Sequence, residues 1–255
     1  MNLHYEKYGE HDQVLVILHG LFGSADNWTS LGKQLGRSFT VYLVDQRNHG
    51  KSPHSNVWNY TAMSNDLKIF LDDNSIHSPV ILGHSMGGKT AMKFASLYPD
   101  YLKKLIIVDI APKYYPVHHR TIINGLQAVA KKGVTSRKQA DQILQDYINE
   151  LPVRQFLLKN LVRNNHDDKM VWRLNLDVID ENIENIGEAL NDNDIINTST
   201  LFIRGGNSDY ILNNDQTLLK KHFPNSSLET IENAGHWVHA EKPKEFLAIV
   251  NTMLT

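Results

Sequence analysis

Residues 79–88 have the sequence Pro79-Val80-Ile81-Leu82-Gly83-His84-Ser85-Met86-Gly87-Gly88. Its apolar run, Val80 to Leu82, is typical of a buried parallel strand. From Lys89 to Tyr98 apolar residues recur at helical spacing, and Pro99 follows. The five residues from Gly83 to Gly87 fit G-x-S-x-G, a pattern that places a serine on a sharp strand-to-helix turn. The flanking glycines are needed because a side chain there would collide with neighbouring backbone. This stretch therefore predicts that the hydroxyl of Ser85 is presented above a sheet.

Further apolar, β-rich segments occur on both sides of this stretch and alternate with segments of helical periodicity. Such alternation predicts an α/β fold with a mostly parallel sheet and helices on both faces. Strands are predicted at 3–8 (an edge), 14–18, 40–44, 80–82, 104–110, 200–204 and 227–231, and core helices at 27–36, 60–73, 89–98, 212–222 and 243–253.

The alternation stops between about residues 113 and 197, where no strand-like run is convincing. We expect this segment to be a helical cap, inserted after the sixth strand, over the carboxyl edge of the sheet. The chain is then a single domain, 1–255, with a core of 1–112 and 198–255. Helices within the insertion are predicted at 122–131, 136–149, 153–161 and 179–190.

Composition excludes several classes of protein. The 255 residues are 41% hydrophobic, which suffices for a sizeable core, and carry a net charge of -2, which gives no reason to expect nucleic acid or an anionic membrane as partner. The absence of cysteine excludes disulfides and a thiol nucleophile. No apolar run approaches the roughly 20 residues of a membrane helix, and the N-terminus has no apolar signal core. We therefore expect a soluble, cytoplasmic protein.

A serine hydroxyl needs a base within hydrogen-bond reach, and the base needs an acid that fixes its tautomer. His236 follows the last predicted strand, in a Gly-His-Trp loop, and comes after Ser85 and both acid candidates in the chain. This order of serine, acid and histidine is the one found in α/β-hydrolases. Asp109 lies at the end of the predicted strand 104–110, and Asp209 comes shortly after the one at 200–204, so both belong to the same edge of the sheet and the residues alone leave the acid open between them.

Acyl transfer also requires donors for the developing oxyanion. We expect them to be the backbone N–H of Met86, directly after the nucleophile, and of Leu21, in the loop after the strand at 14–18. Loss of one such donor typically lowers the rate by about 10²–10³. His118 and His119 have no third ligand at useful spacing, so we expect no metal site there.

Six stretches together resemble one family. The chain is similar to the α/β-hydrolase superfamily from end to end, and more narrowly to the small bacterial YbfF-like carboxylesterases and their eukaryotic relatives. The resemblance implies that Asp109, in Asp-Ile-Ala-Pro, is the acid, with Asp209 as the alternative. It also implies hydrolysis of short- to medium-chain acyl esters, and no metal or organic cofactor. The stretches are His19-Gly20-Leu21-Phe22-Gly23-Ser24, Arg47-Asn48-His49-Gly50, Gly83-His84-Ser85-Met86-Gly87-Gly88-Lys89, Val108-Asp109-Ile110-Ala111-Pro112, Gly205-Gly206-Asn207-Ser208, and Ala234-Gly235-His236-Trp237-Val238-His239-Ala240-Glu241-Lys242-Pro243.

Three functions are compatible with these residues. The first is a serine carboxylesterase or thioesterase that works through an acyl-enzyme intermediate. The second uses the same site for another acyl transfer, for perhydrolysis or for C–C bond hydrolysis, because fold and triad do not separate these reactions. The third is a small-ligand receptor with the hydrolase fold, which would show slow or single turnover.

Overall fold

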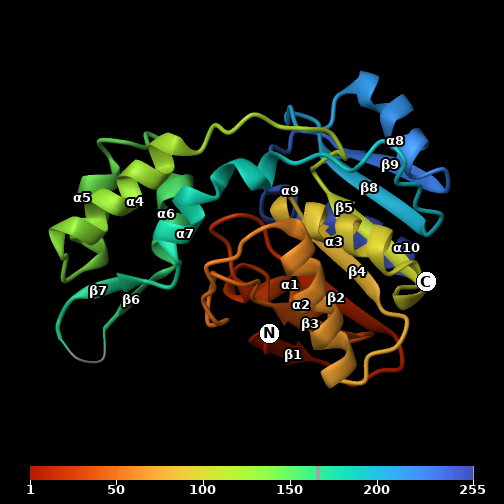
Figure 1. Ribbon diagram of the computed structural model, residues 1–255, viewed down its shortest axis with the longest axis horizontal. Coiled ribbons are helices and arrows are strands. Elements are labelled where there is room, and N and C mark those ends of the chain that lie inside the picture. Colours follow the sequence, from red (N-terminus) through yellow and green to blue (C-terminus); the bar gives the residue numbers. More distant parts are fainter. Residues whose placement is uncertain (165–166, 255) are drawn as a thin grey trace.

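Seven strands form one sheet in the order β1-β3-β2-β4-β5-β8-β9 (Figure 1). The computed structural model describes residues 1–164 and 167–254. The edge strand β1 runs antiparallel to β3, and all other neighbours are parallel. The predicted mostly parallel sheet is therefore confirmed. The strands are β1 (Tyr5–Tyr8), β2 (Val14–Leu18), β3 (Thr40–Val44), β4 (Val80–His84), β5 (Lys104–Val108), β8 (Ser199–Gly205) and β9 (Ser226–Ile231).

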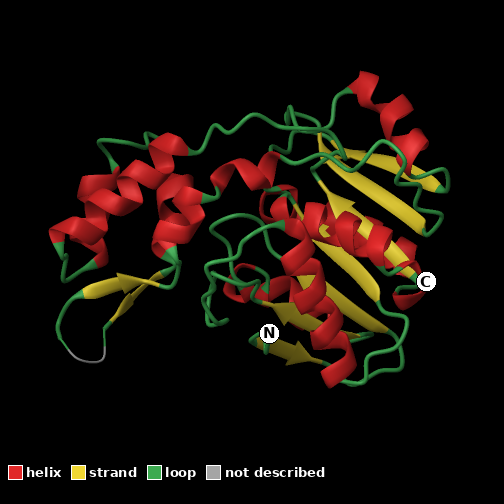
Figure 2. Cartoon of the chain, viewed as in Figure 1, coloured by secondary structure: helices red, strands yellow, loops and turns green. Residues whose placement is uncertain are grey.

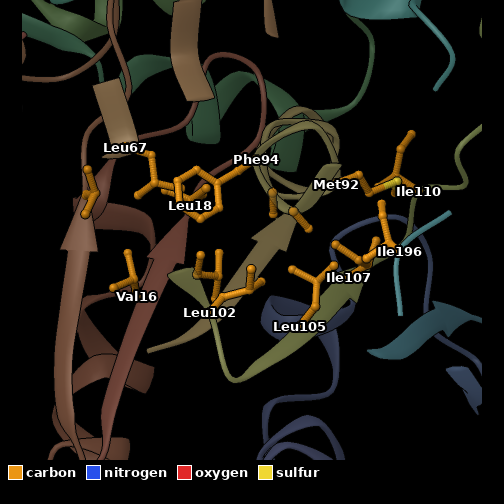
Figure 3. Packing of buried hydrophobic residues seen from close by; sticks show 14 of the residues in the cluster. Val16, Leu18, Leu67, Met92, Phe94, Leu102, Leu105, Ile107, Ile110 and Ile196 are labelled. Atoms are coloured by element: carbon orange, nitrogen blue, oxygen red, sulfur yellow. The ribbon is translucent and has the colours of Figure 1, made fainter. Parts of the chain in front are cut away.

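Helices cover both faces of this sheet (Figure 2). Successive residues of a strand point to opposite faces, so strands buried on both sides must be apolar throughout. On one face α2, α3 and α8 contribute to the cluster that includes Leu18 and Ile107 (Figure 3). On the other face α1 and α10 pack over Ile17 and Val108. The core helices are α1 (Thr29–Leu35), α2 (Tyr60–Asp73), α3 (Met86–Leu97), α8 (Gln216–His222), α9 (Val238–Glu241) and α10 (Pro243–Leu254).

The strand order reverses beside β2, which lies between β3 and β4. In open parallel sheets, ligands bind outside the carboxyl ends of the strands at such a switch point. The loops after β2 and β4 leave the sheet here, and those after β5, β8 and β9 leave from the same edge. The fold thus gathers five loops around one place.

The insertion, which we define as the chain between β5 and β8, forms a separate group of helices beside the core (Figure 1). It also contains a hairpin of two short strands, β6 (Leu161–Arg163) and β7 (Met170–Trp172). The expectation of no strand in this segment was therefore wrong, because three-residue strands are too short to show an alternating pattern. The helices are α4 (Arg120–Lys132), α5 (Arg137–Leu144), α6 (Leu151–Leu158) and α7 (Leu176–Glu181).

The insertion follows the fifth strand of the chain and not the sixth, because only one strand, β1, precedes β2. Its two linkers to the core are joined where they meet: the N–H of Leu190 donates to the carbonyl of Pro112 (3.0 Å), and the N–H of Tyr115 donates to that of Gly187 (2.9 Å). The insertion therefore leaves the core and returns to it at one place.

Apolar side chains of the insertion and of the core loops form a third hydrophobic cluster, which includes Phe22 and Tyr60 from the core. Hydrogen bonds reinforce the contact. The hydroxyl of Tyr60 donates to the carbonyl of Ile186 (2.7 Å), and Nδ2 of Asn160 donates to the carbonyl of Phe22 (2.6 Å). Packing and hydrogen bonding thus hold the insertion against the carboxyl edge of the sheet. Among residues 1–164 and 167–254, no helix has the length and apolar composition to cross a membrane.

A buried ion pair fixes the loop after β3 to α2. Nε of Arg47 donates to Oδ2 of Asp66 at 2.6 Å, and the same guanidinium donates to the carbonyls of Val57 (2.7 Å) and Ala62 (3.2 Å). Both charged side chains are almost fully buried. Removal of one partner would leave the other charge buried without compensation.

We expect Asp66→Ala to lower the free energy of unfolding by about 3–5 kcal/mol, because the buried guanidinium of Arg47 loses its counter-charge. Urea unfolding followed by circular dichroism measures the change. The matched control is Asp72→Ala on the same helix, which breaks an exposed pair with Lys68 and should leave the midpoint at the wild-type value. Equal midpoints for the two variants would contradict this account.

Candidate active site

Ser85 lies between β4 and α3 with φ 52° and ψ −117°, a strained conformation for a residue that has a side chain. The turn is packed closely. A Cβ atom on Gly83 would lie 2.2 Å from the carbonyl oxygen of Gly87, and one on Gly87 would lie 2.3 Å from that of Leu18. Gly83 therefore allows the turn to close on itself, as the sequence pattern predicts, and Gly87 allows it to lie against the end of β2.

His236, in the loop after β9, is hydrogen bonded to Asp109, which directly follows β5. Nδ1 of His236 lies 2.8 Å from Oδ2 of Asp109. The carboxylate is completely buried, and it also accepts hydrogen bonds from the N–H of Gly205 (3.0 Å) and from the hydroxyl of Ser208. These donors fix the orientation of the carboxylate that contacts the imidazole.

This contact determines the tautomer of His236. A carboxylate oxygen accepts hydrogen bonds, so Nδ1 carries the proton, and Nε2 of the neutral ring remains an acceptor. Ser85 and His236 line the same cavity, of about 220 Å³. The structure therefore brings together the serine, the histidine and one of the two acid candidates.

The second acid candidate, Asp209, is exposed to solvent. Its neighbour Ser208 turns inward and donates to Asp109. Of the two aspartates, Asp109 is the one hydrogen bonded to His236.

Two residues beside His236 carry contacts that sequence reasoning did not assign. Ser208 binds the Asp109 carboxylate, and the ring of Tyr210 stacks on the imidazole of His236 with centroids 4.0 Å apart and planes inclined by 20°. The hydroxyl of Tyr210 lies 3.0 Å from Nε2 of His118. The signal in the sequence was their position in the loop after β8, next to the acid candidate Asp209.

His84 supports the His236 loop from the other side. Burial lowers the pKa of His84 well below 6.5, so its ring is neutral. Since a carbonyl oxygen accepts hydrogen bonds, Nε2 of His84 donates to the backbone carbonyl of His236 at 2.9 Å. The residue before the serine thus anchors the backbone of the predicted base.

The loop after β2 is fixed by His19. Nδ1 of His19 donates to the carbonyl of Gly20 (2.8 Å), and its Nε2 accepts from the N–H of Gln46 (3.0 Å). Leu21 follows and lines the cavity beside Ser85.

Met86 is the first residue of α3, so its N–H has no partner within the helix. Both predicted oxyanion donors therefore lie close to the serine: Met86 directly follows Ser85, and Leu21 lines the cavity that Ser85 borders.

Several residues of the insertion also line this cavity, among them His119, Phe156 and Leu157. From the sequence, His119 and its neighbour His118 were expected to form no metal site, and a place in the wall of this cavity was not predicted for them. Burial and the neighbouring His118 lower the pKa of His119 to about 3, so this ring is neutral. The cavity wall is thus mainly apolar, and the described residues that line it include no Asp, Glu, Lys or Arg.

Comparison with known proteins agrees with the fold described above. Residues 13–243 match the alpha/beta hydrolase fold family. The chain is 39% identical to esterase YbfF of Escherichia coli over 94% of this chain and 92% of the relative. It is 40% identical to the sn-1-specific diacylglycerol lipase ABHD11 of Mus musculus, over 94% of this chain and 80% of that protein. A solved structure described as a marine microorganism esterase superimposes with a TM-score of 0.95 at 42% identity and covers 98% of both chains.

We expect acid to destabilise the protein through its buried neutral histidines. Burial lowers the pKa of His49, of His119 and of His239 to about 3. Between pH 3 and 6.5 the unfolded chain therefore binds more protons than the folded one, and stability falls as pH falls, by about 1.4 kcal/mol per pH unit for each such histidine. Urea midpoints at pH 7.5, 6.0 and 5.0 measure this slope.

His49→Asn should reduce the slope, because an amide side chain does not take up a proton in this pH range. The amide can still donate to the carbonyl of Arg47, which in the wild type accepts from Nδ1 of His49 (3.0 Å). The matched control, His77→Asn at an exposed histidine, should keep the wild-type slope. An unchanged slope in His49→Asn would contradict the assignment.

Proposed function

This chain belongs to the α/β-hydrolase family, and on that basis we propose that it is a serine carboxylesterase that hydrolyses short- to medium-chain acyl esters, or thioesters, through an acyl-enzyme intermediate. The relatives reported above include an esterase and a lipase, and the chain is an ester-hydrolysing enzyme of the same kind. The observation that carries the mechanism is the hydrogen bond between Asp109 and His236 beside the strained Ser85.

In the first half-reaction, Oγ of Ser85 attacks the acyl carbon while Nε2 of His236 takes the hydroxyl proton. Asp109 accepts from Nδ1 of His236 and stabilises the imidazolium that forms. The backbone N–H groups of Leu21 and Met86 stabilise the oxyanion of the tetrahedral intermediate. The C–O bond to the leaving group then breaks, and the imidazolium gives its proton to the departing oxygen.

In the second half-reaction, His236 takes a proton from a water molecule, and the resulting hydroxide attacks the acyl-enzyme. The bond to Ser85 breaks, Oγ recovers the proton from the imidazolium, and the carboxylic acid leaves. The products are one alcohol and one acid for each ester and water consumed, and no cofactor takes part in either step.

Asp109 takes the acid role in this mechanism, and Asp209 is the alternative. Burial of Asp109 and its hydrogen bonds from Gly205 and Ser208 support the assignment, because an oriented carboxylate holds the imidazole in the reactive tautomer. The exposure of Asp209 to solvent argues against the alternative, in which Asp209 would be the acid.

We propose further that the insertion acts as a cap on this site, within a single domain of residues 1–255. Its residues His119, Phe156 and Leu157 are part of the cavity wall around Ser85. Apolar walls of this kind exclude water from the reacting ester and bind the substrate's carbon chains.

Ser85→Ala should abolish multiple turnover of p-nitrophenyl acetate, with a loss of about 10³-fold or more, because the acyl-enzyme cannot form. A fluorophosphonate should label the wild type once and Ser85→Ala not at all, as mass spectrometry of the intact protein shows. The matched control is Ser30→Ala at an exposed serine of α1. Labelling with slow or single turnover on every ester would instead favour the receptor function.

Asp109→Asn should lower kcat by about 10³–10⁴, since an amide no longer holds His236 in the reactive tautomer. Asp209→Asn removes an exposed carboxylate and should retain wild-type kcat. Steady-state kinetics on one ester, with circular dichroism as a check on folding, compares the pair. The reverse order of losses would move the acid role to Asp209.

A further inference from the structure

Two cavities of very different size meet at Ser85. The smaller one, of about 30 Å³, lies beside the linkers of the insertion, and His236 is not part of its wall. The larger one, of about 220 Å³, includes His236 and Trp237 in its wall. Ser85, Leu21 and Tyr210 border both cavities. We call the smaller cavity the small compartment and the larger one the large compartment.

The chemistry of the tetrahedral intermediate assigns one part of the ester to each compartment. Its carbon bears Oγ of Ser85, the oxyanion, the leaving oxygen and the acyl chain. Because His236 must protonate the leaving oxygen, that oxygen and its alcohol lie on the side of His236. The acyl chain is the remaining substituent and points away from His236, towards the small compartment.

We propose that this site selects esters of a small acyl group with a large apolar alcohol, the acyl chain lying in the small compartment and the alcohol in the large one. The inference rests on the proposed esterase function and specifies its substrate class. It limits the acyl group to about two or three carbons, because the small compartment has room for about one or two heavy atoms beyond the carbonyl carbon, and it leaves the alcohol free to be much longer.

The wall of the small compartment is held by hydrogen bonds, so it cannot readily widen. Nζ of the buried Lys89 donates to the carbonyls of Lys113 and Glu188, one on each linker of the insertion. Tyr60, also buried, donates to the carbonyl of Ile186 at 2.7 Å. The space of about 30 Å³ holds a group about the size of one or two water molecules. A long acyl chain would have to break these contacts to enter.

The large compartment continues outward. A groove of about 780 Å³ between α6 and α9 shares Val153, Phe156 and Trp237 with it. The rings of Phe156 and Trp237 lie 5.7 Å apart where the two spaces meet. An extended apolar alcohol can therefore run from His236 past these rings and bury its chain along the groove.

Two ester series test the assignment on the intact protein. The first varies the acyl group on one alcohol: p-nitrophenyl acetate, butyrate and octanoate. The second varies the alcohol on one acyl group: ethyl, butyl and octyl acetate, whose leaving groups have similar intrinsic reactivity. We expect kcat/KM to fall at least about 10-fold from acetate to octanoate and to rise about 10-fold or more from ethyl to octyl acetate.

Two variants separate the compartments. Ile186→Ala enlarges the small compartment, whose wall includes Ile186, and should raise the octanoate-to-acetate ratio about 10-fold, with a smaller effect on the alcohol series. Val153→Trp narrows the large compartment and its groove and should lower the octyl-to-ethyl ratio more than the acyl ratio. The control is Ile195→Ala, at an isoleucine that is 61% exposed and borders neither compartment; both ratios should stay at wild-type values.

Faster hydrolysis of octanoate than of acetate, together with no gain from ethyl to octyl acetate, would overturn the compartment assignment and leave the esterase function intact. Equal ratios in Ile186→Ala and in Ile195→Ala would also overturn it. Absence of turnover on both series would overturn the proposed function itself, and this inference with it.

Discussion

The turn between β4 and α3 lies in direct contact with the end of β2, and the geometry of the site depends on this contact. Gly87 permits it, because a Cβ atom there would overlap the carbonyl oxygen of Leu18, and Gly83 lets the turn itself close, because a Cβ atom there would overlap the carbonyl oxygen of Gly87. The contact brings the loop that contains Leu21 beside Ser85 at the carboxyl edge of the sheet. The remaining parts of the site come from loops that leave parallel strands at that same edge.

A second layer of contacts holds His236 on several sides. Asp109 accepts from its ring, His84 donates to its backbone carbonyl, and Tyr210 stacks on its imidazole. Asp109 and His84 lie at the ends of β5 and β4, and Tyr210 lies in the loop after β8. The position of the imidazole therefore follows from the register of the sheet, even though His236 itself lies on a loop.

Much of this arrangement could be predicted from the sequence, because its determinants are local. The G-x-S-x-G pattern predicted the turn at Ser85, and apolar runs predicted the strands. The choice between Asp109 and Asp209 could not be made from the residues, since both follow parallel strands and differ only in the direction that the folded backbone gives them. The β6–β7 hairpin, the hydroxyl of Ser208 and the stacking of Tyr210 were missed because they depend on short strands or on contacts between loops that are distant in the chain.

The attachment of the insertion has an evolutionary consequence. Its two linkers pair with each other through Leu190 and Tyr115 and meet again at the ammonium group of Lys89. Because the ends of the insertion are adjacent, residues can be gained, lost or exchanged between them without a change in the register of the sheet. Descendants of such a protein can therefore diversify the molecules they accept while they inherit the bond-breaking machinery unaltered.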